Sequence, residues 1–180
     1  ATNTASWSAI RQGVLSLSAR SASVINMSLG QPGFVLHPNW RKIFFDPTVH
    51  AATTGRVFVM AAGNDGVTQT TNVRWDFARD PNLILVGSVD PSGKISSFSN
   101  KPGSACLTNE IGCVERLANR FMVAPGELIL MPDGQGGFVR RSGTSFAAPL
   151  VAGAVTLLHD RWPWLAMRPK ETVEILLSSA

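Results

Sequence analysis

The sequence has 180 residues, of which 44% are hydrophobic and 16% charged, and its formal net charge is +4. These values are typical of a folded protein of one domain and exclude a disordered chain. No apolar stretch reaches the roughly 18 residues that cross a bilayer, so we expect no membrane segment. The first residues, Ala1 to Thr4, begin no signal-peptide pattern. Basic residues are scattered, with Arg140-Arg141 the tightest pair, so we expect no nucleic-acid partner.

The first half of the chain predicts one helix followed by three buried strands. Trp7, Ile10, Val14 and Leu17 share one helix face, which predicts an amphipathic helix from Trp7 to Ala19. Three short apolar runs follow, each nearly continuous rather than alternating, as in a parallel sheet covered on both faces. They are Val24–Met27, Val57–Ala62 and Leu83–Val86.

The second half predicts a long insertion, a fourth strand, a hairpin and two helices. The insertion is Gly103–Asn119, the strand is Phe121–Ala124, and the hairpin joins Glu127–Leu130 to Gly137–Arg140. The apolar run Ala147–Leu158 predicts a helix buried on all sides. A last helix begins at Pro169, a residue favoured at the first helical position. This alternation predicts one α/β domain of three layers, a mostly parallel sheet with helices on both faces.

Two cysteines, Cys106 and Cys113, lie seven residues apart in the insertion. Their spacing suits either a small disulfide-closed loop or a pair of free thiols. It fits neither a C-x-x-C motif nor a zinc site.

Ser145 follows Gly143-Thr144 and opens the apolar helix. Its hydroxyl and backbone N–H therefore lie at a helix N-terminus, where unpaired donors and the positive end of the dipole gather. An oxyanion formed beside this serine would meet a donor. Read alone, the serine is equally compatible with a simple helix cap.

Two predicted strands end in small and polar residues. Asn64 follows Ala61-Ala62-Gly63 at a carboxyl strand end, where ligands bind in open parallel sheets. Its amide group can donate to an oxyanion, and the small residues before it leave room for a substrate side chain. The strand Val24–Met27 continues into Ser28-Leu29-Gly30, whose edge can pair with an extended peptide. Taken alone, each segment is more simply explained as a turn or strand end.

Taken in order, three segments resemble the motifs of the subtilisin-like serine peptidases, or subtilases. They are VINMSLG at Val24–Gly30, AAGN at Ala61–Asn64 and GTSFAAPLVAG at Gly143–Gly153. LILVGSVD, ISSFSN and VAPG, at 83–90, 95–100 and 123–126, also follow the order of that family. The resemblance covers nearly the whole chain. The insertion and the C-terminal run resemble the subtilase passengers of bacterial autotransporters more than the small secreted enzymes.

The resemblance implies a subtilisin-like fold and a serine endopeptidase that forms an acyl-enzyme on Ser145. It implies that Asn64 is the side-chain oxyanion donor, assisted by Thr144. The backbone of Ser28, Leu29 and Gly30 would pair with the substrate. Ala61, Ala62 and Gly63 would form one wall of the primary specificity pocket, and we expect the other wall within Val67–Asp80.

The resemblance also implies a peptide or protein substrate and a secreted, periplasmic or cell-surface location. Such a location favours the disulfide over free thiols at Cys106 and Cys113. No carboxylate cluster marks a calcium site, so we expect neither a metal nor a cofactor.

The catalytic Asp and His motifs of the family precede the serine, and neither is found here. His37, His50 and His159 all follow VINMSLG, and we expect structural roles for them, with His159 a charge partner at a helix C-terminus. A serine hydroxyl without a base is a weak nucleophile. We therefore predict that residues 1–180 are the C-terminal portion of a catalytic domain, inactive alone and partnered by its N-terminal remainder. Such an incomplete sheet exposes an edge and an apolar face, which predicts self-association.

Two other interpretations stay open. A sedolisin-type peptidase shares the S-G-T-S signature but uses carboxylates as partner groups, which Asn64 disfavours. A non-catalytic subtilase-like module would grip extended peptides by strand addition. Upstream Asp and His motifs in the full gene would separate the enzyme from the module.

Overall fold

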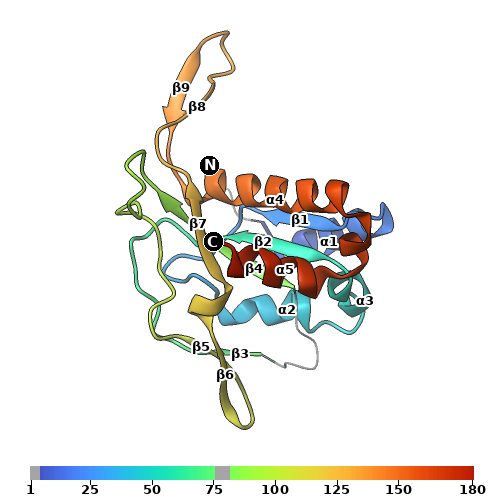
Figure 1. Cartoon of the computed structure of the whole chain (residues 1–180). Coiled ribbons are helices and arrows are strands. Elements are labelled where there is room, and N and C mark those ends of the chain that lie inside the picture. Colours follow the sequence, from blue (N-terminus) through green and yellow to red (C-terminus); the bar gives the residue numbers. More distant parts are fainter. Residues whose placement is uncertain (1–4, 76–81) are drawn as a thin grey trace.

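A four-stranded parallel sheet in the order β1-β2-β4-β7 forms the centre of the computed structural model, which describes residues 5–75 and 82–180 (Figure 1). The strands are β1 (Val24–Met27), β2 (Val57–Ala61), β4 (Leu83–Val89) and β7 (Phe121–Pro125). The four predicted strands are thus confirmed. Strand β4 runs past its predicted end because its pairing with β7 continues to Val89. The prediction made for Ala1 to Thr4 falls outside the described residues.

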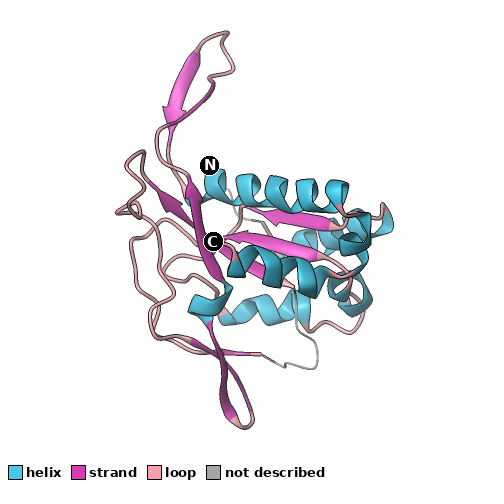
Figure 2. Cartoon of the chain, viewed as in Figure 1, coloured by secondary structure: helices cyan, strands magenta, loops and turns pink. Residues whose placement is uncertain are grey.

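Helices cover both faces of this sheet (Figure 2). The helices are α1 (Trp7–Ala19), α2 (Arg41–Phe44), α3 (His50–Thr54), α4 (Thr144–Arg161) and α5 (Pro169–Ser178), with 3₁₀ turns η1 (Pro38–Trp40), η3 (Leu117–Arg120) and η4 (Pro163–Met167). Helix α1 has the predicted bounds, and Ser6 caps it by accepting a hydrogen bond from the Ala9 backbone N–H at 3.2 Å.

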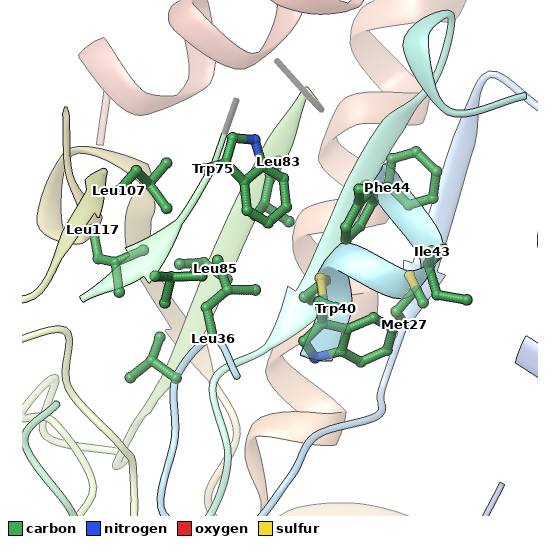
Figure 3. Packing of buried hydrophobic residues seen from close by; sticks show 14 of the residues in the cluster. Met27, Leu36, Trp40, Ile43, Phe44, Trp75, Leu83, Leu85, Leu107 and Leu117 are labelled. Carbon is green, nitrogen blue, oxygen red and sulfur yellow. The ribbon is translucent and has the colours of Figure 1, made fainter. Parts of the chain in front are cut away.

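The sequence of β2 is continuously apolar because both of its faces are buried. Successive side chains of a strand point to opposite faces. Phe58 and Met60 pack into a core with residues of α1 and α2, part of which is drawn in Figure 3. Val57 and Val59 pack into a second core with residues of α4 and α5. The predicted three-layer α/β fold is confirmed.

Two strands of the insertion, β5 and β6, join the earlier strand β3 in a second, small sheet of the order β3-β5-β6. Its strands are β3 (Val73–Arg74), β5 (Cys106–Asn109) and β6 (Gly112–Arg116). A disulfide joins Cys106 to Cys113 across β5 and β6, so that prediction is confirmed.

The predicted hairpin is present as β8 (Ile129–Pro132) and β9 (Phe138–Arg141), one or two residues from its predicted bounds. It stands away from the body of the molecule just before α4 (Figure 1).

Helix α4 differs from its prediction in extent and in burial. It begins at Thr144, before the apolar run, and ends at Arg161. It is not buried on all sides, because Leu150 and Leu157 are 52% and 71% exposed. Only the face carrying Ala147, Val151 and Val155 packs on the sheet, and no described residue covers Leu157 on the opposite side. Among the described residues no helix is long and apolar enough to span a bilayer.

Candidate active site

The carboxyl ends of β1 and β2 meet the N-terminus of α4 at a cavity of about 210 Å³. The cavity is lined by Leu29, Gly30, Gln31, Pro32, Ala61, Gly63, Asn64, Asp65, Thr144 and Ser145. Because parallel strands all end at one edge of a sheet, residues far apart in the sequence come together there. The structure thus gathers seven of the nine predicted site residues around one cavity: Leu29, Gly30, Ala61, Gly63, Asn64, Thr144 and Ser145.

The two remaining predicted residues lie beside the cavity rather than in its lining. Ala62 is fully buried in the core shared with α1 and α2, and its backbone N–H donates to the Val86 carbonyl at 2.9 Å. Its side chain therefore cannot form a wall of the cavity. Ser28 lines an adjoining cavity of about 640 Å³, which shares Leu29 and Gly30 with the first.

Thr144 fixes the orientation of the Asn64 side chain. The Asn64 carbonyl oxygen Oδ1 accepts hydrogen bonds from the Thr144 backbone N–H at 2.8 Å and from the Thr144 hydroxyl at 2.9 Å. The Thr144 hydroxyl in turn accepts from the Gly63 backbone N–H at 3.1 Å. With Oδ1 held by two donors, the Asn64 NH₂ group is left as a donor toward the exposed side, since Asn64 is an exposed residue.

Ser145 is the second residue of α4, so its backbone N–H has no partner inside the helix. Four residues later Pro149 lacks the N–H that would donate to the Ser145 carbonyl. Ser28 supplies the missing donor, because its hydroxyl donates to the Ser145 carbonyl oxygen at 3.0 Å. The start of α4 is thus tied to the end of β1 next to the Ser145 hydroxyl.

Gln31, Pro32 and Asp65 also line the cavity, although sequence reasoning did not include them. Gln31 and Asp65 each directly follow a predicted site residue and Pro32 follows Gln31, and this continuity was the available signal. The expected second wall within Val67–Asp80 is not found among its described residues 67–75, and residues 76–80 lie outside the described part of the chain. Gln31 and Pro32 contribute to the lining instead.

None of the three histidines lies at the Ser145 cavity. His50 begins α3, before β2, and so lies at the other edge of the sheet. His159 is fourteen residues after Ser145 on α4, about 21 Å along the helix axis. His37 lines only the adjoining cavity, and burial lowers its pKa, with a smaller lowering from the Lys42 charge.

The role expected for His159 needs a correction. It is 8% exposed, and its ring nitrogens lie 3.0 Å from the Ser23 hydroxyl and 3.2 Å from the Thr172 hydroxyl. Burial lowers its pKa, so the neutral ring is favoured. His159 is a buried hydrogen-bonding residue rather than a charge partner of the helix end.

Known proteins resemble this chain in sequence and in fold. The profile of the subtilase family matches residues 2–180. The chain belongs to the subtilase family. Members of this family are serine proteases, and the fold of this subtilase chain is the one seen in its solved relatives.

Two curated relatives illustrate the match. The epidermin leader peptide-processing serine protease EpiP of Staphylococcus epidermidis is 26% identical, over 92% of this chain and 43% of its own length. Subtilisin DY of Bacillus licheniformis is 30% identical, over 89% of this chain and 51% of its own length. The subtilase chain therefore spans about half the length of these relatives.

Two solved structures of proteases have a similar fold. The prenylagaramide maturation protease PagA superposes with a TM-score of 0.66 and 27% identity, over 98% of this chain and 58% of its own. A cold-adapted subtilisin-like serine proteinase superposes with a TM-score of 0.65 and 27% identity, over 98% of this chain and 56% of its own.

Proposed function

We propose that residues 1–180 are the C-terminal portion of one subtilase catalytic domain, a serine endopeptidase whose nucleophile is Ser145. The supporting observation is the pair of hydrogen bonds from Thr144 to the Asn64 carbonyl oxygen. These bonds leave the Asn64 NH₂ group as a donor in the same cavity as Ser145. A helix cap alone would not need a side chain from the loop after β2 to be held by two hydrogen bonds at this place.

In the proposed reaction the Ser145 Oγ attacks the carbonyl carbon of a peptide bond. The negative charge that develops on the carbonyl oxygen is stabilised by the Asn64 NH₂ group and the Ser145 backbone N–H. Collapse of the tetrahedral intermediate breaks the C–N bond and releases the amine, which takes up the proton removed from Ser145. Water then hydrolyses the acyl-enzyme in a second step of the same kind.

The substrate proposed is an extended peptide or protein segment. Leu29 is 40% exposed and Gly30 is also exposed, so their backbone is accessible for pairing with an added strand. Ala61 and Gly63 line the cavity with little side-chain volume, which leaves space for a substrate side chain. Ala62, which lies between these two residues in the sequence, packs in the core, and the Ser28 hydroxyl holds the Ser145 carbonyl next to Leu29.

The base that removes the Ser145 proton is proposed to come from a segment outside this sequence, since no His, Asp or Glu among the described residues hydrogen-bonds the Ser145 hydroxyl. Three surface features support docking of that segment on the part of the chain around β1 and α4. Among the described strands, β1 is at the end of the sheet and pairs with β2 alone. An apolar cavity of about 280 Å³ lies between α1 and β1. Leu150 and Leu157 are exposed on α4, which also contacts β1.

These features also support self-association of the isolated chain, because an open strand edge and exposed leucines can pair with a second copy. We further propose a secreted, periplasmic or cell-surface location, which the Cys106–Cys113 disulfide supports. The insertion that holds this disulfide and the projecting β8–β9 hairpin are the features that support an autotransporter-passenger type.

Fluorophosphonate labelling tests the proposed function. The chain of residues 1–180 should label slowly or not at all, and the longer protein that carries the base should label rapidly at Ser145. Ser145→Ala should abolish the labelling, while Ser178→Ala, which removes an exposed serine of α5, should leave it unchanged. Rapid labelling of the isolated chain would refute the dependence on an outside base.

A non-catalytic peptide-binding module is the second candidate, and it is favoured because none of the described residues places a base in hydrogen-bond contact with the Ser145 hydroxyl. It predicts that extended peptides bind to the longer protein while fluorophosphonate never labels it. Peptide binding measured by calorimetry alongside the labelling separates the two.

A further inference from the structure

Asn100 lies outside the cavity, yet it contacts the backbone on two sides of it. It is 0% exposed, in the loop after β4. Its backbone N–H donates to the Gly63 carbonyl at 3.0 Å. Its side-chain oxygen Oδ1 accepts from the backbone N–H groups of Asp65 at 3.0 Å and Val67 at 3.2 Å.

The NH₂ group of Asn100 reaches the other side of the cavity. It donates to the Phe34 carbonyl at 3.1 Å and to the Asp65 carboxylate oxygen Oδ2 at 3.2 Å. The same Asp65 oxygen accepts from the Gly33 backbone N–H at 3.0 Å. The Asn100 amide and the Asp65 carboxylate therefore join the segment after β1, which carries Gln31 and Pro32, to the segment after β2, which carries Asn64. We call these two side chains the bracket.

Gly63 packs tightly against the Asn100 side chain of this bracket. Gly63 has φ +99°, a conformation that favours glycine, and a Cβ there would lie 2.3 Å from the Asn100 amide nitrogen. The backbone before Asn64 is thus pressed directly on the Asn100 side chain. Removing the Asn100 side chain would free Gly63 to shift, and with it the direction in which Asn64 presents its NH₂ group.

We propose that Asn100, acting with Asp65, is a positioning residue that sets the oxyanion donor Asn64 relative to the Gln31–Pro32 wall of the cavity. It touches neither substrate nor reacting atoms, and it acts through Gly63 and Asp65. Its effect on catalysis rests on the proposed function, whereas its effect on the geometry of Asn64 does not.

Nuclear magnetic resonance of the isolated chain tests the geometry directly. In Asn100→Ala the side-chain NH₂ resonances of Asn64 and the backbone amides of Gly63, Asp65 and Gly33 should shift or broaden. Asn82→Ala is the matched control, because Asn82 is 4% exposed and its amide donates to backbone carbonyls of Thr54 and Arg56, at 3.0 and 3.4 Å. It should lower the melting temperature similarly and leave the Asn64 resonances unchanged. Unchanged Asn64 resonances in a folded Asn100→Ala chain would overturn the proposal.

A charge exchange gives a second measurement that a merely structural role would not reproduce. Asn100→Asp sets a second carboxylate against that of Asp65, and like charges this close repel. Adding Asp65→Asn removes this repulsion and lets residue 65 donate to residue 100, although the Phe34 carbonyl loses its donor and the Gly33 N–H loses its acceptor. The double variant should therefore recover part of the change that the single variant causes in the Asn64 resonances. A double variant as perturbed as the single one would contradict the bracket.

Kinetics of the longer protein complete the test. Because small misplacements of a reacting constellation cost up to about 100-fold in rate, Asn100→Ala should lower kcat by about 10- to 100-fold while Asn82→Ala does not. If the longer protein proves inactive, the proposed function fails, but the resonance shifts still decide the role of Asn100. If Asn100→Ala and Asn82→Ala lower kcat equally, the positioning role is refuted.

Discussion

The carbonyl oxygen of Asn64 accepts two hydrogen bonds from Thr144, one from the backbone N–H and one from the hydroxyl. The two residues stand 80 positions apart and belong to the loop after β2 and to the first turn of α4. Because the amide oxygen is held in this way, the amide nitrogen is oriented before any substrate arrives. An oxyanion donor that needs no reorganisation is the most effective kind.

Replacing Thr144 by Val should weaken this orientation while keeping the side-chain shape. The backbone N–H still donates to Asn64, but the second donor is lost and the Gly63 N–H loses its acceptor. We expect kcat of the longer protein to fall about tenfold, equivalent to about 1.4 kcal/mol, with KM nearly unchanged. Thr144→Ser keeps the hydroxyl and should retain most of the activity. A Val variant with the kcat of the parent would show that the hydroxyl is not needed.

Removing the Asn64 donor itself should have a larger effect than removing Thr144. For Asn64→Ala we expect kcat to fall by about 10²–10³, the magnitude known for the side-chain oxyanion donor of subtilisin, a member of the same family. Substrate binding should change little, because the charge develops only in the transition state. Burst kinetics with an activated ester measure the acylation step. A loss confined to KM would contradict the oxyanion role.

Most of the main sheet was predictable, because buried parallel strands have a plain pattern in the sequence. The apolar runs ending at Met27 and Ala62 have no competing explanation, and both were found as strands. The burial of α4 was not predictable in the same way. A helix such as Thr144–Arg161 is apolar on every side whether or not a covering segment is present, so Leu157 looks buried in the sequence although it is exposed here.

The grouping of Ser145 and Asn64 around one cavity was predictable, because a carboxyl strand end and a helix start both leave a pattern in the sequence. Which neighbouring residues line that cavity was not predictable, because burial decides it. Ala62 and Gly63 are both small, but the alternation of β2 sends Ala62 into the core. The side chain of Asn100 bonds to residues 35 and 66 positions away, and no local pattern reveals such partners.

The disulfide should stabilise the small sheet without affecting the cavity. Closing a loop between residues seven apart is worth about 2.5 kcal/mol in the chain-entropy estimate. We expect Cys106→Ala/Cys113→Ala to lower the free energy of unfolding by about this amount, measured by urea denaturation. Peptide binding to the cavity should not change. An unaltered free energy of unfolding would mean that the β5–β6 pairing alone holds the loop.

Introducing a charge at Leu157 should distinguish the isolated chain from the longer protein. Leu157 is 71% exposed in residues 1–180, so Leu157→Arg should change the stability of this chain by less than about 0.5 kcal/mol. If the proposed segment that carries the base covers α4, the same change should cost the longer protein about 3 kcal/mol or more, because it buries an unpaired charge. The matched control is Leu130→Arg, on the projecting hairpin, where the leucine is 58% exposed. Equal effects of both variants in the longer protein would argue against a segment docked on α4.

Acid should weaken the packing of α4 and α5 through His159. The Thr172 hydroxyl donates its proton to the Leu165 carbonyl at 3.1 Å, so it accepts from the His159 Nε2–H, and Nδ1 is left to accept from Ser23. Burial lowers the pKa of His159 below the ordinary 6.5, so between these two values the unfolded chain binds more protons than the folded one. The contribution of His159 is therefore fully present above pH 6.5 and is lost as the pH falls through the folded-state pKa. Urea denaturation across this range should show a slope that His159→Gln reduces, with His37→Gln as the comparison, since the pKa of His37 is lowered as well. If His159→Gln leaves the slope unchanged, the buried ring does not titrate with unfolding, and the acid sensitivity arises elsewhere.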